Sequence, residues 1–200
     1  MTTAEKIIRA KTDYDNVYEA GMKAENDRFW NSYQSRGYET GYLYAFSGTR
    51  WTDSVYNPKY TLKPSGNASY MFLYSRITDT KVTIDLSNTT SNILGMFANS
   101  TIKTIRKIIF GENNPIWNKQ FENCSNLENI TAEGVLAKSI SLQWCTKLTH
   151  DSLMSIIGVL KDYSTDTSGT VYTITLGEEN LAKLTEDEKE IITNKGWQYG

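Results

Sequence analysis

The amino-acid sequence predicts an α/β repeat protein: a short solenoid with parallel strands, preceded by a long N-terminal helix and closed by helix and strand elements at the C-terminus. Apolar residues recur at a displacement of 25 positions in the second half of the chain. The first 37 residues carry a heptad-like pattern, and residues 149–200 alternate helix and strand signals. Thr, Ser and Asn make up 57 of the 200 residues, which is typical of turns and exposed polar positions.

Composition excludes several classes of function. The chain has 21 basic and 23 acidic residues and a net charge of −2, so no basic excess favours a nucleic-acid partner. No apolar run is long enough to insert into a membrane. Lys6 and Arg9 are followed by no apolar segment, so we expect no signal peptide. Two cysteines and one histidine offer little for a metal site, and we expect no metal and no cofactor.

Residues 1–37 read as one long helix. Thr2 and Glu5 fit a capping box at its start, and Gly37 fits a C-terminal stop. Two interpretations stay open: an amphipathic helix packed on its own domain, or a coiled-coil stalk that joins copies of the chain, most simply as a homotrimer. The seam of such a stalk would consist of Ile7, Ala10, Tyr14, Val17, Gly21 and Ala24.

Residues 38–70 form an aromatic, turn-rich segment. Two interpretations are open here as well. The aromatic side chains would either fill the open end of the following solenoid as an N-terminal cap, or lie exposed and stack on sugar rings. In the second case the best candidates for ligand binding are Tyr42, Tyr44, Trp51 and Tyr56.

Residues 71–200 contain the internal repeat. Periods of 20–29 residues with apolar positions at fixed offsets are typical of a leucine-rich-repeat-like solenoid. The pattern predicts strands near 82–86, 105–110 and 127–131, and it predicts that Phe97 and Phe121 are buried at equivalent positions. The four copies are Met71–Ile77, Met96–Ile102, Phe121–Ile130 and Leu142–Leu148.

Cys124 and Cys145 occupy equivalent offsets in neighbouring copies. Buried, unreactive thiols are the simplest interpretation, and a disulfide between adjacent coils is the alternative.

The C-terminal segment predicts a closing cap. Thr149 is placed to cap a helix over 150–162, followed by a strand over 171–176. Residues 180–184 and 186–194 predict a short helical turn and a last helix, and Gly196 fits the end of that helix.

No residue pattern predicts catalysis. His150 lies beside Asp151 at a helix start, and a surface histidine is the simplest interpretation. Asp53 and Asp85 have no partner at a spacing that implies paired carboxylates. An acidic cluster near the C-terminus lacks the pattern of a calcium loop and reads as a solvated face. It consists of Glu178, Glu179, Glu186, Asp187, Glu188 and Glu190.

The frame F-x-x-C-x-x-L-x-x-I, seen in Phe121–Ile130, resembles the leucine-rich repeats called BspA-like, which occur on surface and secreted proteins of gut and oral bacteria. The segments Leu148–Ile157 and Lys195–Trp197 look like the closing part of such proteins from gut Firmicutes and their phages. Members of that group are often tail or minor structural proteins. The second and fourth copies here are short and irregular, which departs from the pattern.

The resemblance implies a non-enzymatic, virion-associated protein of a phage or prophage tail or baseplate, with a structural or receptor-binding role. The expected partners are other virion proteins and a protein or glycan of the bacterial surface. The alternative is a leucine-rich-repeat adhesion protein on the bacterial surface or secreted from the cell.

Overall fold

The computed structural model describes residues 61–64, 67–90, 92–115, 117 and 119–200. The predicted N-terminal helix (1–37) and residues 38–60 of the predicted aromatic cap lie outside these residues. Of the predicted cap segment, the structure describes residues 61–64 and 67–70. The boundaries predicted at 37 and 70 stay predictions.

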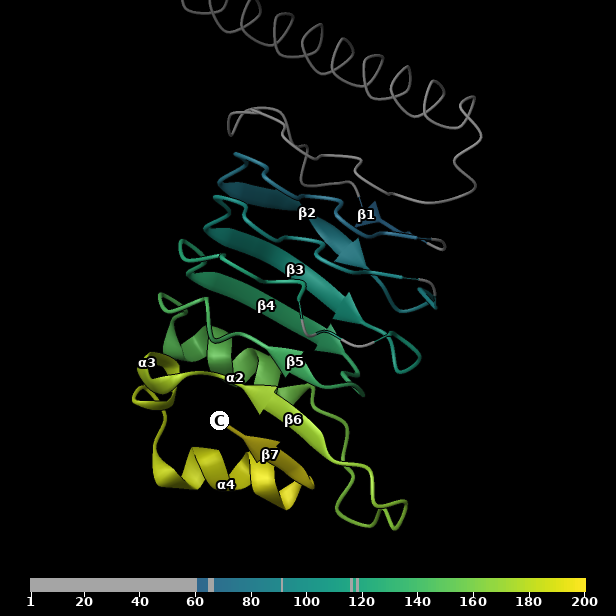
Figure 1. Ribbon diagram of the computed structural model, residues 1–200, viewed down its shortest axis with the longest axis vertical. Helices are drawn as coiled ribbons and strands as arrows, with labels where there is room; N and C mark the ends of the chain where they lie inside the picture. The colour runs from purple at the N-terminus through teal and green to yellow at the C-terminus, as the bar shows by residue number, and fades with distance from the viewer. Residues whose placement is uncertain (1–60, 65–66, 91, 116, 118) are drawn as a thin grey trace, which may run out of the picture. The chain divides into compact units, whose positions relative to one another are not determined.

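Four parallel strands form the first sheet, in the order β1-β2-β3-β4. They are β1 (Thr61–Leu62), β2 (Asp79–Asp85), β3 (Thr104–Phe110) and β4 (Asn129–Gly134). Thr80 pairs with Ile105 and Ile105 with Ile130, a displacement of 25 residues at the start of β2, β3 and β4. After a register shift within each pair of strands, the displacement is 24 residues. The strands lie one below another, and the chain returns between them on the other side of the fold (Figure 1). Each strand with its return is here named a coil.

The alternation of side chains explains the sheet. Ile84, Ile108 and Ala132 are aligned neighbours on three strands, and all three are buried. Their flanking residues are at least partly exposed and, except for Ile109, polar, as expected for a sheet with one face on the core and one in solvent. The predicted parallel-strand α/β architecture is therefore confirmed for the described residues, with strands close to their predicted positions.

The return segments also bond to one another. The backbone N–H groups of Phe72 and Phe97 donate to the carbonyls of Met96 and Gln120, at 2.7 and 2.9 Å. Further along, this side becomes a second parallel sheet in the order β5-β6-β7. Its strands are β5 (Ile140–Ser141), β6 (Tyr172–Thr175) and β7 (Trp197–Tyr199). Strand β7 was not predicted; Gly196 (φ 78°) ends the last helix and turns Trp197 into register with Tyr172.

A stack of phenylalanine rings runs through the core. The ring centroids of Phe72 and Phe97 lie 5.3 Å apart, those of Phe97 and Phe121 lie 5.2 Å apart, and both pairs are nearly parallel. All three side chains are buried. The predicted burial of Phe97 and Phe121 at equivalent positions is confirmed.

Helix α2 (His150–Gly158) lies against β4, where a fifth strand of the first sheet would otherwise lie. The hydroxyls of Ser152 and Ser155 accept the N–H groups of Ile130 and Ala132, at 2.9 and 2.8 Å. Thr149 caps the helix through its side chain, as predicted. The helix ends at Gly158 rather than at 162 because Leu136 bonds to the backbone of Val159 and Lys161.

Two further helices close the fold: α3 (Glu178–Leu181) and α4 (Glu186–Asn194). The predicted last helix is confirmed, and Thr185 and Glu188 form its capping box. The ammonium of Lys195 donates to three carbonyls at the C-terminus of α2, where a cation is favoured. The buried amide of Asn180 likewise binds the carbonyls of Leu142, Cys145 and Leu176.

Candidate functional site

The side chains predicted to bind ligand lie outside the described residues. Tyr42, Tyr44, Trp51 and Tyr56 fall before residue 61, and so do the six seam residues of the N-terminal helix. Both sets stay predictions. The candidate site described below is therefore built from other residues.

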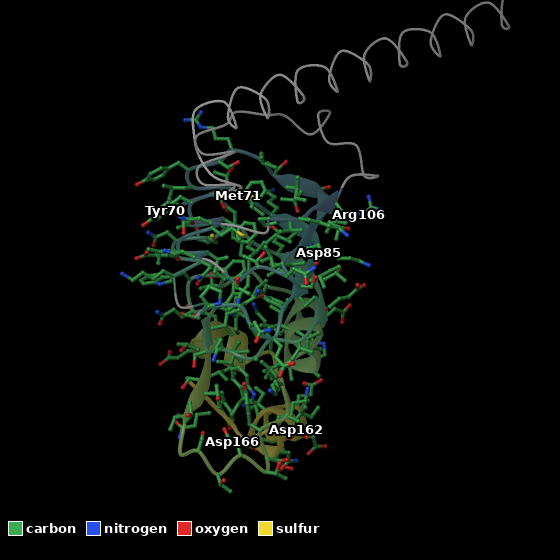
Figure 2. The ribbon with its side chains drawn as sticks, turned by 90° about the vertical axis from the view of Figure 1, so that its right-hand side faces the viewer. Tyr70, Met71, Asp85, Arg106, Asp162 and Asp166 are labelled. Atoms are coloured by element: carbon green, nitrogen blue, oxygen red, sulfur yellow. The ribbon has the colours of Figure 1, made fainter. Side chains whose placement is uncertain are left out.

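One turn recurs in four successive coils and places one side chain at the surface in each; the side chain in the second coil is only partly exposed and the other three are exposed. These side chains are Tyr74, Asn99, Asn123 and Trp144, and they are here named the turn row. Each directly precedes a buried residue, which is Ser75, Ser100, Cys124 or Cys145. The turns lie on the side of the fold opposite the sheet face that carries Asp85 and Arg106; Tyr70 and Met71 mark the first of them (Figure 2).

The backbone of the turn explains the residue types. Tyr74, Asn99 and Asn123 have φ values of 54°, 54° and 56°, in the left-handed region. Asparagine is among the few residues other than glycine that enter this region readily. At Tyr74 the backbone is bonded to the next coil, because the N–H of Tyr74 donates to the carbonyl of Ala98 at 3.2 Å.

The turn row has an aromatic ring at each end and two amides between. Tyr74 is 61% exposed and Trp144 is 49% exposed. The Nδ2 group of Asn123 donates to Oδ1 of Asn99 at 2.9 Å. Three steps between coils separate the two rings, and at the usual spacing between strands this is roughly 14 Å. The row thus presents a narrow strip of neutral side chains on a regular backbone.

Beneath the turn row, the two thiols are buried. Sγ of Cys124 donates to the carbonyl of Phe97 at 2.9 Å, and Sγ of Cys145 to that of Phe121 at 3.8 Å. Burial raises the pKa of Cys124 to about 11 and raises that of Cys145 further above its ordinary range. Both cysteines are free, so the buried-thiol interpretation is confirmed and the disulfide alternative is wrong.

The outer face of the first sheet carries ion pairs between neighbouring strands. Nζ of Lys107 lies 2.5 Å from the carboxylate of Glu133, and Nζ of Lys63 lies 3.5 Å from that of Asp85. Burial opposes ionisation of Asp85, but hydrogen bonds from Ser87 and the Lys63 charge outweigh it and lower the pKa of Asp85. Exposed ion pairs of this kind contribute little to stability.

A shallow pocket of about 530 Å³ lies near the loop that precedes β6. Its lining combines apolar groups with one cation and several polar groups, which is a common composition for a ligand site. The lining includes Asn92, Pro115, Lys138, Ser139, Val171 and Tyr172.

His150 joins two helices. Its Nε2 atom lies 2.8 Å from the carboxylate of Glu188 on α4, and its Nδ1 atom lies 3.6 Å from Asp151. The hydrogen bond to Glu188 raises the pKa of His150 above its ordinary value. The histidine is exposed at the helix start, as predicted, while Glu188 is more buried than the solvated acidic face predicts because it completes the capping box of α4.

Two general properties concern the described part of residues 61–200, which leaves out residues 65, 66, 91, 116 and 118. No group of three or more His, Cys, Asp or Glu side chains is arranged to hold a metal ion there. No helix of this part of the chain is both long and apolar enough to cross a membrane.

Comparisons with known proteins found no family model, no curated protein and no solved structure that matches this chain.

The turn row was missed in the sequence because the repeat was aligned on its apolar positions. The signal was present in the same alignment. The residue before each buried Ser or Cys is Tyr, Asn, Asn or Trp, and Asn at a fixed position of a repeat is typical of a left-handed turn.

Proposed function

We propose that this protein is a non-enzymatic recognition component of a phage or prophage virion, located in the tail or baseplate. In this proposal residues 71–200 form a leucine-rich-repeat-like solenoid of the BspA-like type. The displacement of 25 residues between parallel strands and the stacked phenylalanines support that assignment.

The observation that carries the proposal is the turn row. A rigid repeat that presents one surface side chain per coil suits weak, repeated contacts with an extended partner. Weak contacts become useful when several copies of a protein are held together, because the effective concentration of the second contact is high. The predicted N-terminal coiled coil would supply that assembly.

The absence of a catalytic function is part of the proposal. The Cys124 and Cys145 thiols have raised pKa values and are occupied by carbonyl contacts, which disfavours a nucleophilic role. His150 is engaged with Glu188 in a contact between helices. These arrangements support a binding protein over a hydrolase.

The location is tested in the bacterium whose genome encodes the chain. Prophage is induced, virions are purified by density gradient, and the protein is quantified by mass spectrometry in virions, cell envelope and culture supernatant. We expect enrichment in virions together with tail proteins, and immunogold labelling at the tail. Enrichment in the envelope of uninduced cells, with none in virions, would overturn the virion proposal and support the surface-adhesin alternative.

A further inference from the structure

We propose that the turn row binds an extended, β-1,4-linked glycan that carries acetamido groups, with the sugar chain running across the coils. The inference rests on the proposed recognition function and adds to it the chemical class of the ligand and the residues that hold it.

Spacing is the first argument. The rise of one sugar in an extended β-1,4-linked chain is close to the distance between neighbouring parallel strands. A chain laid along the turn row therefore meets one side chain per sugar, over about four sugars from Tyr74 to Trp144. A polymer whose rise per unit differs from the spacing between coils would contact only one or two side chains of the row.

The two rings supply the second argument. Tyr74 and Trp144 expose large apolar surfaces at the two ends of the row. Aromatic rings with a polar edge suit the face of a pyranose, which is apolar over its C–H groups and polar at its rim. The stacked rings of Phe72, Phe97 and Phe121 beneath the turns pack the first three coils against one another.

The side-chain amides of Asn99 and Asn123 are the reason for assigning an acetamido group to the ligand. Within the described residues, the hydrogen bond from Asn123 to Asn99 leaves the Nδ2 group of Asn99 and Oδ1 of Asn123 without partners. One is a donor and the other is an acceptor. A secondary acetamide offers the complementary pair, a carbonyl oxygen and an N–H, so it can bond to both asparagines.

The surroundings favour a neutral ligand. Exposed hydroxyl and amide side chains flank the row at Thr101, Ser125 and Gln143. The exposed charges beside it are of both signs, as at Arg76 and Glu122. A neutral glycan would find hydrogen-bonding groups at these three positions along the row.

The test is calorimetric titration of the full-length protein with chitohexaose, a β-1,4-linked hexamer of N-acetylglucosamine. Cellohexaose, which lacks the acetamido groups, is the comparison ligand. We expect saturable binding of chitohexaose and binding of cellohexaose that is weaker by roughly tenfold. Equal binding of the two hexamers would overturn the assignment of the amide pair.

The variants are chosen to keep the left-handed backbone. Tyr74→Asn and the double variant Asn99→Gly with Asn123→Gly retain residues that tolerate positive φ. Together with Trp144→Ala, each should weaken chitohexaose binding by about tenfold. Tyr199→Ala removes an exposed aromatic side chain on β7, away from the row, and should leave binding unchanged.

Three outcomes overturn the inference. They are no chitohexaose binding by the wild type, unchanged binding in the folded turn-row variants, and loss of binding only when Trp51 and Tyr56 are replaced by alanine. Circular dichroism of each variant confirms that it is folded. Since virion association is measured separately, failure of the glycan assignment leaves the proposed virion function standing, and the reverse also holds.

Discussion

Two serine hydroxyls on α2 accept backbone N–H groups of β4 that a further parallel strand would otherwise bind. Ser152 accepts the N–H of Ile130 and donates to the carbonyl of Glu128 at 3.1 Å. Ser155 accepts the N–H of Ala132. A sheet edge with unpaired N–H groups is a template for pairing with another chain. The hydroxyls therefore satisfy the edge and also fix the position of α2.

Replacing Ser152 by alanine should lower the free energy of unfolding by about 1–3 kcal/mol, because the buried N–H of Ile130 loses its acceptor. Urea denaturation followed by circular dichroism measures the change. Ser125→Ala, at an exposed turn, is the matched control and should be within about 0.5 kcal/mol of wild type. An unchanged urea midpoint in Ser152→Ala would contradict the role given to this hydroxyl.

The single histidine allows a direct pH measurement. Its pKa is raised in the folded protein by the hydrogen bond to Glu188. The resulting stabilisation is fully present below the pKa of the unfolded state and is lost as the pH rises through the folded pKa. Wild type should therefore lose stability relative to Glu188→Gln as the pH rises from the ordinary histidine pKa through the raised pKa of the folded state.

An NMR titration of the His150 ring checks this prediction. The pKa should fall toward its ordinary value in Glu188→Gln, a substitution that keeps a capping-box residue at this position. Asp151→Asn should lower it less, because that carboxylate lies 3.6 Å from the ring. Equal pKa values in wild type and Glu188→Gln would show that the contact between α2 and α4 is absent in solution.

Neither thiol should react with a thiol reagent in the folded protein. With a pKa of about 11, Cys124 is almost entirely protonated at neutral pH, and both sulfurs are buried. Ellman's reagent should label neither cysteine in native buffer and both in guanidinium chloride. Rapid labelling of the native protein would contradict the packing of the turns.

At the scale of elements, the phenylalanine stack joins three coils. Phe97 lies between Phe72 and Phe121, so its removal weakens two interfaces between neighbouring coils. Phe97→Ala should cost about 3–5 kcal/mol of unfolding free energy. Phe121→Ala should be of similar size. Denaturant unfolding measures both, and an unchanged melting temperature for either variant would mean that the coils are aligned wrongly.

The elements that could be predicted are those with local signals. Strand β3 follows from closely spaced apolar residues, and helix α4 from a helical segment with Gly196 at its end; both lie at or within one residue of the expected bounds. The short strands β1, β5 and β7 have too few residues for a periodic pattern. They exist because their neighbours in space offer backbone partners, as Tyr172 does for Trp197.

The candidate site was less predictable for a physical reason. Repeat alignment responds to buried positions, because burial constrains residue type most strongly. Three members of the turn row, Tyr74, Asn99 and Asn123, share a positive φ, which Trp144 does not have. Tyr, Asn, Asn and Trp do not look alike as a sequence column, although they occupy the same place in successive coils.

At the scale of the whole molecule, the predicted stalk determines how many turn rows act together. If residues 7–24 form a coiled coil, the full chain should be a trimer at about tens of micromolar, and removal of residues 1–36 should give a folded monomer. Light scattering coupled to size-exclusion chromatography distinguishes the two. A monomeric full-length chain at that concentration would contradict the stalk.

Helix α2 covers the edge of the first sheet at β4, and this has a consequence for how such a chain can evolve. Ser152 and Ser155 meet the backbone of β4, and any strand in the same register would offer the same N–H groups. Gene duplication or deletion of one 25-residue unit before β4 would therefore leave the closing end intact. Each such event would lengthen or shorten the turn row by one strand spacing, so that reach along a partner could change while the terminus stays the same.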